Sequence, residues 1–546
     1  MSRYFKLFNK LEKDFHLGTA TFIIAALTLI SRVLGFLRDL LLARQLGISS
    51  ETDIYFTAFR IPDLIYNLLI LGTLSAAFIP VFTSYYLKDK KEAWKIASGV
   101  LNSAVLVIAI ICAGIYFFTT PLTNILAPGF TSDQVAATAV LTKIFLLSPI
   151  LFTISNVFSS SLLSLKKFIW VNMAPLFYNA GIIVGIVWLY PMMGLSGIAW
   201  GVILGALLHG MIQLPQLIAL GFSWRPSFNW KHKGIRKIFT LFIPRVLGLD
   251  ISYVNLIIVS VVGSALTTGT ISAFNFANNI QAVPLGIFAL STTLAVFPLL
   301  SEHYAKKEIE SFVNTFNKAF VRILYFIMPA AALLLLLRAY LVRLLIGYGK
   351  CDWTCTVTTF DALGILSFSL VAQSLIPLVS RAFYARQDTK TPVIIGLAAM
   401  VINAVLSYYL SFSLGIIGIA FGFLIAAGLQ LLLLFSVLHK AIGKELIDRT
   451  NAAHLLQKDY YILGNLVKIA LACLLTAVSC YGSLYVIDNI VDTHTVIGIL
   501  IQLVFSLLIS GLVYLLTTAK MGIPDAVQIK NSLSKMGQFF NVSNIS

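Results

Sequence analysis

Charged residues are scarce in this chain of 546 residues. Only 11% of them are Asp, Glu, Lys or Arg, whereas 59% are hydrophobic. An average soluble domain carries about a quarter charged residues. Apolar runs of the roughly 20 residues that a membrane helix needs recur along the chain, and the gaps between them are too short for a soluble domain. The composition therefore excludes a water-soluble fold and predicts an all-α polytopic membrane protein.

The sequence also lacks the motifs of several enzyme classes. It contains no Walker loop, HExxH metal motif or GxSxG nucleophile elbow, so we expect neither ATP hydrolysis nor a hydrolase, and no cofactor. Three of its five cysteines, Cys112, Cys473 and Cys480, lie in apolar runs. Cys351 and Cys355 have no His or third Cys nearby, which disfavours a metal site and leaves a short disulfide open.

The apolar runs predict about fourteen membrane-spanning helices. Their expected ranges are 19–45, 52–84, 93–118, 134–165, 168–189, 194–219, 236–263, 269–300, 312–337, 356–384, 389–412, 415–438, 463–487 and 495–518. The corresponding segments are an N-terminal segment (1–18), a first lobe (19–219), a linker (220–235), a second lobe (236–438), a loop (439–462), two further helices (463–518) and a tail (519–546).

The basic residues sort by membrane side. The net charge is +17, from 39 basic and 22 acidic residues, and the basic residues gather in alternate loops. The intervening loops without Lys or Arg lie near 46–51, 119–133, 190–193, 264–268, 413–415 and 488–494. Only the loop 338–355, with Arg338, Arg343 and Lys350, breaks this pattern. The positive-inside rule then predicts cytoplasmic termini and an even number of spans. Anionic lipid headgroups account for the basic loops, so we expect no nucleic-acid partner.

Three matches in the same order indicate an internal repeat. The stretch 32–35 recurs at 245–248, 77–86 at 295–304, and 194–201 at 415–422, at offsets of 213, 218 and 221 residues. The repeat unit is six helices, which predicts two parallel six-helix repeats plus two extra C-terminal helices. Such repeats are typical of transporters that work by alternating access. Gly197, Gly201 and Gly205, spaced four apart, predict close helix packing.

Charged and amide side chains fall inside the first two predicted helices of each repeat. A basic residue at the centre of a membrane helix costs about 2.5 to 3.5 kcal/mol on insertion scales, so it usually faces a cavity or a partner. A cationic cavity between the two bundles suits an anionic substrate, because guanidinium groups bind phosphate oxygens. The candidate substrate-binding residues are Arg32, Arg38, Asp39, Asp53, Arg60, Arg245, Asn278 and Asn279.

Two simpler interpretations of these arginines stand beside the cavity. Arg32, Arg38 and Arg245 can be structural, neutralised by acidic residues such as Asp39 or Asp250 across helix contacts. Arg60 is nearer a span end, where snorkelling to the membrane surface is the ordinary explanation.

Several motifs resemble one known family. The segments 31–39 (SRVLGFLRD), 59–64 (FRIPDL), 76–80 (AAFIP) and 383–392 (FYARQDTKTP) are similar to motifs of the MurJ (MviN) family of lipid II flippases. The resemblance implies a fold of the multidrug/oligosaccharidyl-lipid/polysaccharide exporter superfamily. It also implies that the substrate is lipid II, an undecaprenyl-pyrophosphate-linked disaccharide peptide, moved to the outer leaflet of the bacterial cytoplasmic membrane. We expect the protein to be a monomer.

The resemblance has further implications for single residues. The family's functional arginines in helix 1 match Arg32 and Arg38, and its acidic positions match Asp39 and Asp53. The family uses membrane potential or a sodium or proton gradient, and some members hold sodium near helices 7 and 11. The weak candidates for such a site here are Asp250, Asn255 and Asn403.

The chain departs from the family at five positions. Tyr66 and Asn67 stand where many relatives carry a basic pair, Leu71 replaces an acidic residue, and Asn278 and Asn279 replace an aspartate and an arginine. Arg245 adds a basic residue in the seventh predicted helix. The exact lipid-linked substrate therefore stays open.

Three other functions compete with this prediction. One is the export of a different lipid-linked oligosaccharide. A cationic-drug exporter is disfavoured because the predicted cavity carries arginines. A membrane glycosyltransferase needs a carboxylate base and usually a large external loop, whereas most external loops here are short and only Asp361 is placed to serve as base.

Overall fold

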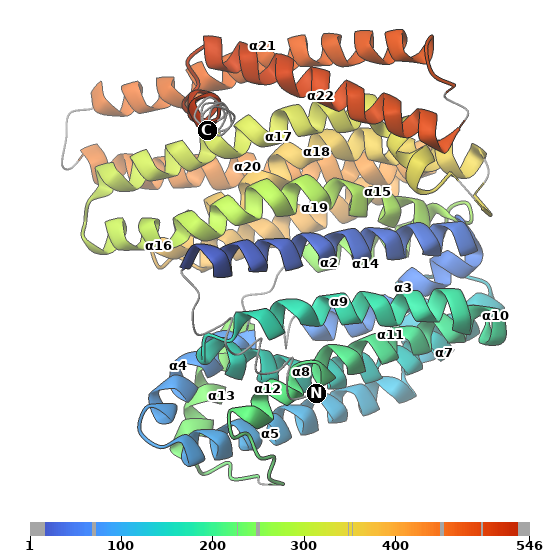
Figure 1. Cartoon of the computed structure of the whole chain (residues 1–546), viewed down its shortest axis with the longest axis vertical. Helices are drawn as coiled ribbons and strands as arrows, with labels where there is room; N and C mark the ends of the chain where they lie inside the picture. Colours follow the sequence, from blue (N-terminus) through green and yellow to red (C-terminus); the bar gives the residue numbers. More distant parts are fainter. Residues whose placement is uncertain are drawn as a thin grey trace, which may run out of the picture. The chain divides into compact units, whose positions relative to one another are not determined.

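The computed structural model describes residues 17–67, 73–226, 228–246, 252–347, 349–351, 353–447, 453–492 and 495–532. All regular structure in these ranges is helical, as expected for segments that must satisfy their backbone hydrogen bonds within a bilayer. The chain divides into two compact units, Met1–Ser272 and Ala273–Ser546, each a bundle of helices (Figure 1).

The N-terminal unit carries the first candidate residues. Its helices are α2 (Leu17–Leu46), α3 (Ser50–Ile65), α4 (Thr73–Tyr86), α5 (Lys90–Phe117), α6 (Thr119–Leu126), α7 (Ser132–Phe145), α8 (Leu147–Ser164), α9 (Phe168–Val184), η2 (Gly185–Leu189), α10 (Tyr190–Met193), α11 (Leu195–Met211), α12 (Leu214–Ala219), α13 (Lys233–Val246) and α14 (Ser252–Gly263). Helix α9 packs between α2 and α11, and α14 contacts α3. The first three residues of α15 (Thr270–Pro284) also belong to this unit.

The C-terminal unit contains longer helices. They are α15 (Thr270–Pro284), whose first turn ends the N-terminal unit, η3 (Leu285–Leu290), α16 (Ser291–Ala305), α17 (Ile309–Leu345), α18 (Trp353–Ala385), α19 (Lys390–Leu414), α20 (Ile416–Ile447), α21 (Ala453–Asp488) and α22 (Val496–Lys520). Helix α20 packs on α18 and α19, whereas α21 and α22 pack on each other and on α17.

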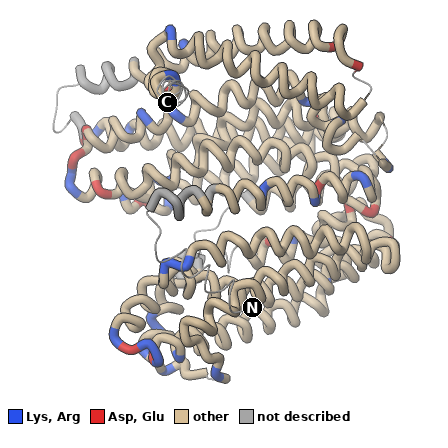
Figure 2. Tube along the Cα trace, viewed as in Figure 1, with Lys and Arg blue, Asp and Glu red and all other residues tan. Residues whose placement is uncertain are grey.

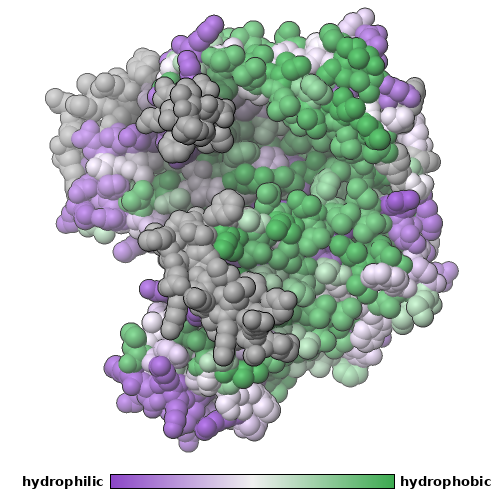
Figure 3. Space-filling view, viewed as in Figure 1, coloured by the Kyte–Doolittle hydropathy of each residue, from purple (hydrophilic) through white to green (hydrophobic). Residues whose placement is uncertain are grey.

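Each unit has its own apolar core and an apolar outer surface. Phe78, Phe82 and Trp94 are buried in the N-terminal unit, and Phe312 and Leu378 in the C-terminal unit. Figure 3 shows hydrophobic atoms over much of the visible surface, and Figure 2 shows charged residues gathered mainly toward helix ends. Such a surface suits lipid tails, and the cores are held by close van der Waals packing.

The predicted all-α membrane fold is confirmed, and the count of fourteen spans stays a prediction. Eleven helices in the described residues are long and apolar enough to cross a membrane. The remaining predicted spans, 19–45, 52–84 and 236–263, correspond to α2, to α3 with α4, and to α13 with α14. Residues 68–72 and 247–251, inside two of these spans, lie outside the described residues, and the segment boundaries also stay predictions.

Local geometry in each unit supports the repeat. Gly194 and Gly415 have φ angles of 61° and 58°, and each is followed by a helix. Lys166 and Gln387, which are also 221 positions apart, have φ angles of 59° and 62°. Matching left-handed residues at one offset in both halves are difficult to explain without duplication, because a non-glycine residue rarely takes φ above zero.

The loop that broke the charge pattern holds a disulfide. Cys351 is bonded to Cys355, with their Cα atoms 5.5 Å apart. Disulfides persist in oxidising compartments, so this bond fits the external side that the basic-residue pattern predicts for the loop.

Candidate functional site

Arg38 is held by two side chains of the N-terminal unit. Its Nη2 and Nε atoms donate to Asp39 Oδ1 at 2.7 and 2.9 Å, and its Nη1 donates to Asn179 Oδ1 on α9 at 3.2 Å. The side chains of Arg38 and Asp39 are 25% and 21% exposed. The guanidinium is therefore oriented by hydrogen bonds and still accessible to an anion.

Asn179 connects this site to the packing of α2 on α9. Its Nδ2 atom donates to the carbonyl oxygens of Pro175, at 3.1 Å in its own helix, and of Ser31, at 3.4 Å on α2. A Cβ atom at Gly35 would come within 3.7 Å of the Asn179 amide, which is ordinary contact. Asn179 was not among the predicted residues, although an amide inside the apolar run 168–189 was a usable signal.

The surroundings of Arg38 are balanced in charge. Asp63 on α3 lies within electrostatic range of both Arg38 and Arg60, and Tyr55 and Tyr178 also act on Arg38. Two arginines and the two carboxylates of Asp39 and Asp63 give this group no net charge. A positive charge that is not neutralised within this group must therefore come from another residue.

Arg32 supplies that charge. It lies on α2 six residues before Arg38, its side chain is exposed, and no hydrogen bond or ion pair joins it to another described residue. Because its guanidinium keeps all five donors available, Arg32 is better placed than Arg38 to bind a phosphate.

Asp53 accepts hydrogen bonds at the N-terminus of a different helix. It lies in the first turn of α3, is 3% exposed, and accepts hydrogen bonds from the backbone N–H groups of Gly269 at 2.6 Å and Ser272 at 2.7 Å. These groups are at the N-terminus of α15, where orphan N–H groups and the helix dipole favour a carboxylate. Asp53 thus fixes the beginning of α15 to α3.

Arg60 makes a second connection from α3. Its Nε atom donates to Ser260 Oγ on α14 at 2.7 Å, and the residue is only 6% exposed. In the described arrangement Asp53 and Arg60 both face protein rather than an open surface. Their predicted contact with substrate stays a prediction.

The remaining candidates are only partly described. Asn278 and Asn279 lie on α15 and are half-buried. The side chain of Arg245, at the end of α13, and residues Leu71 and Asp250 lie outside what the structure describes. At two of the departures from the family, the Tyr66 ring is tilted against Phe152 with ring centroids 4.7 Å apart, and Asn67 Nδ2 donates to Asp63 O in its own helix.

The sodium candidates provide oxygen atoms. Asn255 on α14 is half-buried. Asn403 on α19 is buried, its Oδ1 accepts from Ser407 Oγ at 3.0 Å, and that hydroxyl lies 3.4 Å from Ile419 O. Oxygen ligands fit a hard cation. Within the described residues there is no cluster of three His, Cys, Asp or Glu side chains that suits a transition metal.

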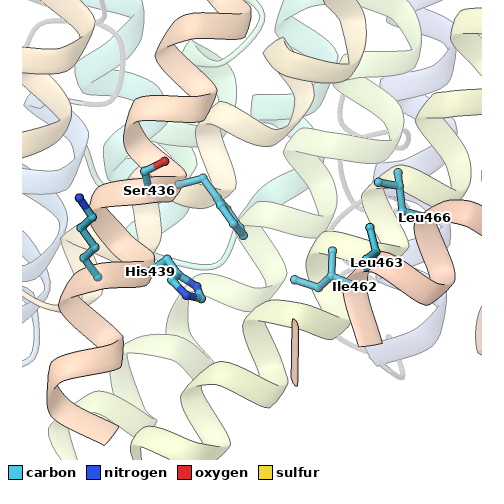
Figure 4. A pocket seen from close by; sticks show the side chains of 7 residues that line it. Ser436, His439, Ile462, Leu463 and Leu466 are labelled. Atoms are coloured by element: carbon cyan, nitrogen blue, oxygen red, sulfur yellow. The ribbon is translucent and has the colours of Figure 1, made fainter. Parts of the chain in front are cut away.

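A pocket of about 400 Å³ lies between α20 and α21 in the C-terminal unit. Figure 4 shows Ser436 and His439 on one helix facing Ile462, Leu463 and Leu466 on the other. Its lining is mostly apolar, and none of the predicted site residues contributes to it.

Comparisons with known proteins agree along most of the chain. A family model described as "Lipid II flippase MurJ" matches residues 42–506. A "Probable lipid II flippase MurJ" of Vibrio cholerae serotype O1 is 32% identical over 434 residues, which cover 76% of this chain and 82% of the relative. A "Probable lipid II flippase MurJ" of Buchnera aphidicola subsp. Acyrthosiphon pisum is 29% identical over 507 residues, which cover 92% of this chain and 96% of the relative.

Solved structures agree with the sequence comparison. "Lipid II flippase MurJ, inward closed conformation" matches with a TM-score of 0.73 and 25% identity, over 92% of this chain and 98% of that one. An inward-facing multidrug transporter of the MATE family matches with a TM-score of 0.62 at 16% identity, over 78% of this chain and 99% of that one. The latter similarity concerns the fold alone.

Proposed function

Because the chain belongs to the lipid II flippase MurJ family, we propose that it moves lipid II from the inner to the outer leaflet of the bacterial cytoplasmic membrane by alternating access. The observation that carries this proposal is the family match over residues 42–506. The protein is a transporter in this proposal and catalyses no covalent step.

Arg32 and Arg38 would bind the pyrophosphate of the substrate. Arg32 is exposed and can bind phosphate oxygens through two parallel N–H groups. Arg38 is oriented by Asp39 and Asn179 and partly exposed, so it can add a second contact. Arginine suits this role because it stays protonated at every relevant pH.

The energy for transport would come from the membrane potential or from an ion gradient. The chain has no Walker loop, which is why a gradient is the proposed source. If sodium is used, Asp250, Asn255 and Asn403 stay the candidate residues for binding it. We further propose that the protein works as a monomer with both termini in the cytoplasm.

Complementation tests the proposal. A bacterium depleted of its native flippase would express this chain as wild type or with Arg32→Ala, Arg38→Ala or Arg245→Ala, at equal membrane abundance. Arg225→Ala is the matched control, because Arg225 is an exposed loop residue whose backbone carbonyl accepts from Asn102, a bond that the substitution keeps. We expect rescue by the wild type and the control, and loss of rescue by Arg32→Ala and Arg38→Ala.

The outcomes separate the alternatives. Failure of a well-expressed wild type would favour another lipid-linked oligosaccharide as substrate. Rescue by all three arginine variants would remove the phosphate-binding role. Loss with Arg245→Ala as well would add that arginine to the site.

A further inference from the structure

A polar stripe runs along the buried face of α22. Gln502, Ser506, Ser510, Tyr514 and Thr518 follow one another at intervals of four residues, and none is more than 7% exposed. The opposite face carries exposed apolar residues such as Phe505, Leu508 and Leu512. Burying five polar side chains inside a membrane protein costs free energy unless their polar atoms form hydrogen bonds.

The stripe faces the other helices of the C-terminal unit that pack on α22, namely α17 and α21. Gln502 Nε2 donates to Leu484 O on α21 at 3.0 Å, and the Ser510 hydroxyl lies beside the Cys480 thiol. Tyr514 Oη donates to Tyr325 O on α17 at 2.6 Å. In Figure 1, α21 and α22 run side by side at the top, in orange and red.

Three oxygen atoms of the stripe have no hydrogen-bond partner among the described residues. They are Gln502 Oε1, Ser506 Oγ and Ser510 Oγ, all on residues that are 0% exposed. Thr517 and Thr518, farther along the same helix, donate to carbonyls of the preceding turn. Helix geometry therefore permits such bonds, yet Ser506 does not make one. A buried oxygen without a partner costs about 1 to 3 kcal/mol, which a bound water would recover.

The spacing of the stripe fits one water between neighbouring polar groups. Four residues of an α-helix rise about 6 Å. Two hydrogen bonds of about 2.8 Å each, through a single water, bridge nearly the same distance. From Gln502 to Thr518 the stripe extends about 24 Å, against a hydrocarbon thickness of about 30 Å.

Ionisable groups extend the stripe at both ends. At one end, Tyr340 on α17 is within hydrogen-bonding reach of Gln502 and within electrostatic range of Asp488. At the other end, the Tyr325 hydroxyl is within reach of Thr518 and interacts with Asp525, which follows α22 and pairs with Arg322 at 3.0 Å. Burial raises the pKa of the Asp525 carboxyl, although Arg322 opposes this.

We propose that this stripe binds a file of water molecules and conducts protons between Asp488 and Asp525, through helices that lie outside the two six-helix repeats. A proton entering beside Asp488 and Tyr340 passes from water to hydroxyl along the stripe. Each water or hydroxyl releases one proton forward as it accepts one from behind, whereas the Gln502 amide only holds water in place. No covalent bond changes overall, and one proton leaves at Asp525. The membrane potential drives the movement.

Proton uptake by liposomes tests this without lipid II. The full chain is reconstituted into liposomes containing the pH-sensitive dye pyranine, and a potassium diffusion potential is imposed with valinomycin. We expect the wild type to take up protons faster than protein-free liposomes. Ser506→Ala and Tyr514→Phe should slow uptake by about tenfold, as expected when one hydrogen-bonded relay is lost.

Ser479→Ala is the matched control. Ser479 lies on α21 and donates to Thr476 O within its own helix, so its loss should leave uptake unchanged. Elution as a single species and an unchanged unfolding midpoint would establish that each variant is folded. Should Ser506→Ala misfold, Gln502→Leu tests the same path at its outer end.

Either of two results overturns the proposal: wild-type uptake equal to that of protein-free liposomes, or equal uptake by the folded wild type and both stripe variants. Because the assay contains no lipid II, a failure here leaves the flippase proposal standing, and a failure of complementation leaves this proposal standing.

Discussion

Asp53 begins one helix and stabilises the start of another. It is the fourth residue of α3, and its carboxylate accepts two N–H groups at the N-terminus of α15. A charged acceptor is favoured there because the hydrogen bonds are charge-assisted and the helix dipole is positive at that end. The charge that made Asp53 a substrate candidate is thus already used within the protein.

Asp53→Ala should lower the free energy of unfolding by about 2 kcal/mol, because loss of a capping side chain costs up to this amount. Asp53→Asn keeps an acceptor oxygen and should cost less. The measurement is the thermal unfolding midpoint of the purified protein in detergent. The control is Asp133→Ala, since Asp133 is an exposed residue in the first turn of α7. Equal midpoints for Asp53→Ala and the control would contradict the capping role.

The partners of these residues explain what sequence could and could not predict. Charges inside apolar runs identified Arg38, Asp53 and Arg60 as residues that need a partner. Their partners, however, are far along the chain: Asn179 is 141 residues from Arg38, Ser260 is 200 from Arg60, and Gly269 is 216 from Asp53. Composition cannot distinguish a carboxylate that meets a ligand from one that meets a distant helix terminus.

At the scale of elements, glycines set how closely α9 approaches α11. A Cβ atom at Gly205 would overlap the carbonyl oxygen of Tyr178, and Gly181, Gly185 and Gly201 meet backbone atoms in the same way. The spacing of Gly197, Gly201 and Gly205 had predicted close packing, and this is confirmed. Backbone contact of this kind strengthens van der Waals packing between membrane helices.

Gly205→Ala should therefore destabilise the protein by about 1 to 3 kcal/mol through overpacking. Gly428→Ala is the control: Gly428 lies inside α20, and a Cβ there meets nothing within 4 Å. Alanine is a better helix former, so that change should be neutral or stabilise by up to about 1 kcal/mol. Unfolding midpoints that move in the same direction for both variants would argue against close packing as the cause.

The linker 220–235 is joined to α5 by a hydrogen bond between His232 and Glu92. Glu92 accepts from Lys95 at 3.1 Å and from His232 at 2.8 Å. The hydrogen bond from Lys95, and then that from His232, hold the pKa of the Glu92 carboxyl below its usual 4.5. A lowered pKa stabilises the folded state above the unfolded-state pKa, and this contribution is lost as pH falls through the folded-state value.

The stability difference between wild type and Glu92→Gln should thus be present at pH 7 and should fade as pH falls below 4.5 and through the lower pKa of the folded state. It should not exceed about 1 kcal/mol, because the pair is partly exposed and screened by solvent. Unfolding midpoints across pH 3 to 8 measure it. A difference that persists unchanged at the acid end would mean that Glu92 acts through packing rather than charge.

For the whole molecule, the length of the apolar runs was the most informative signal for predicting the membrane helices. It located the eleven helices that are long and apolar enough to cross a membrane. It was least informative where polar residues and prolines interrupt a run, as in 52–84, where Pro62 and Pro80 lie inside helices. The π-helical turn 285–290, which follows Pro284, could not be predicted either. Hydropathy does not distinguish the hydrogen-bond pattern of a π-helix from that of an α-helix.

Membrane sidedness gives the last prediction. Alkaline phosphatase, which is active only outside the cytoplasm, would be fused either after Asp492, before α22, or after Ser546. Helix α22 is 25 residues long, with the loop at 488–494 free of Lys and Arg and with Lys520 in its last turn. Positive charges stay in the cytoplasm, so the first fusion should be active and the second inactive. Activity in both fusions would mean that α22 does not cross, and the span count would then be odd.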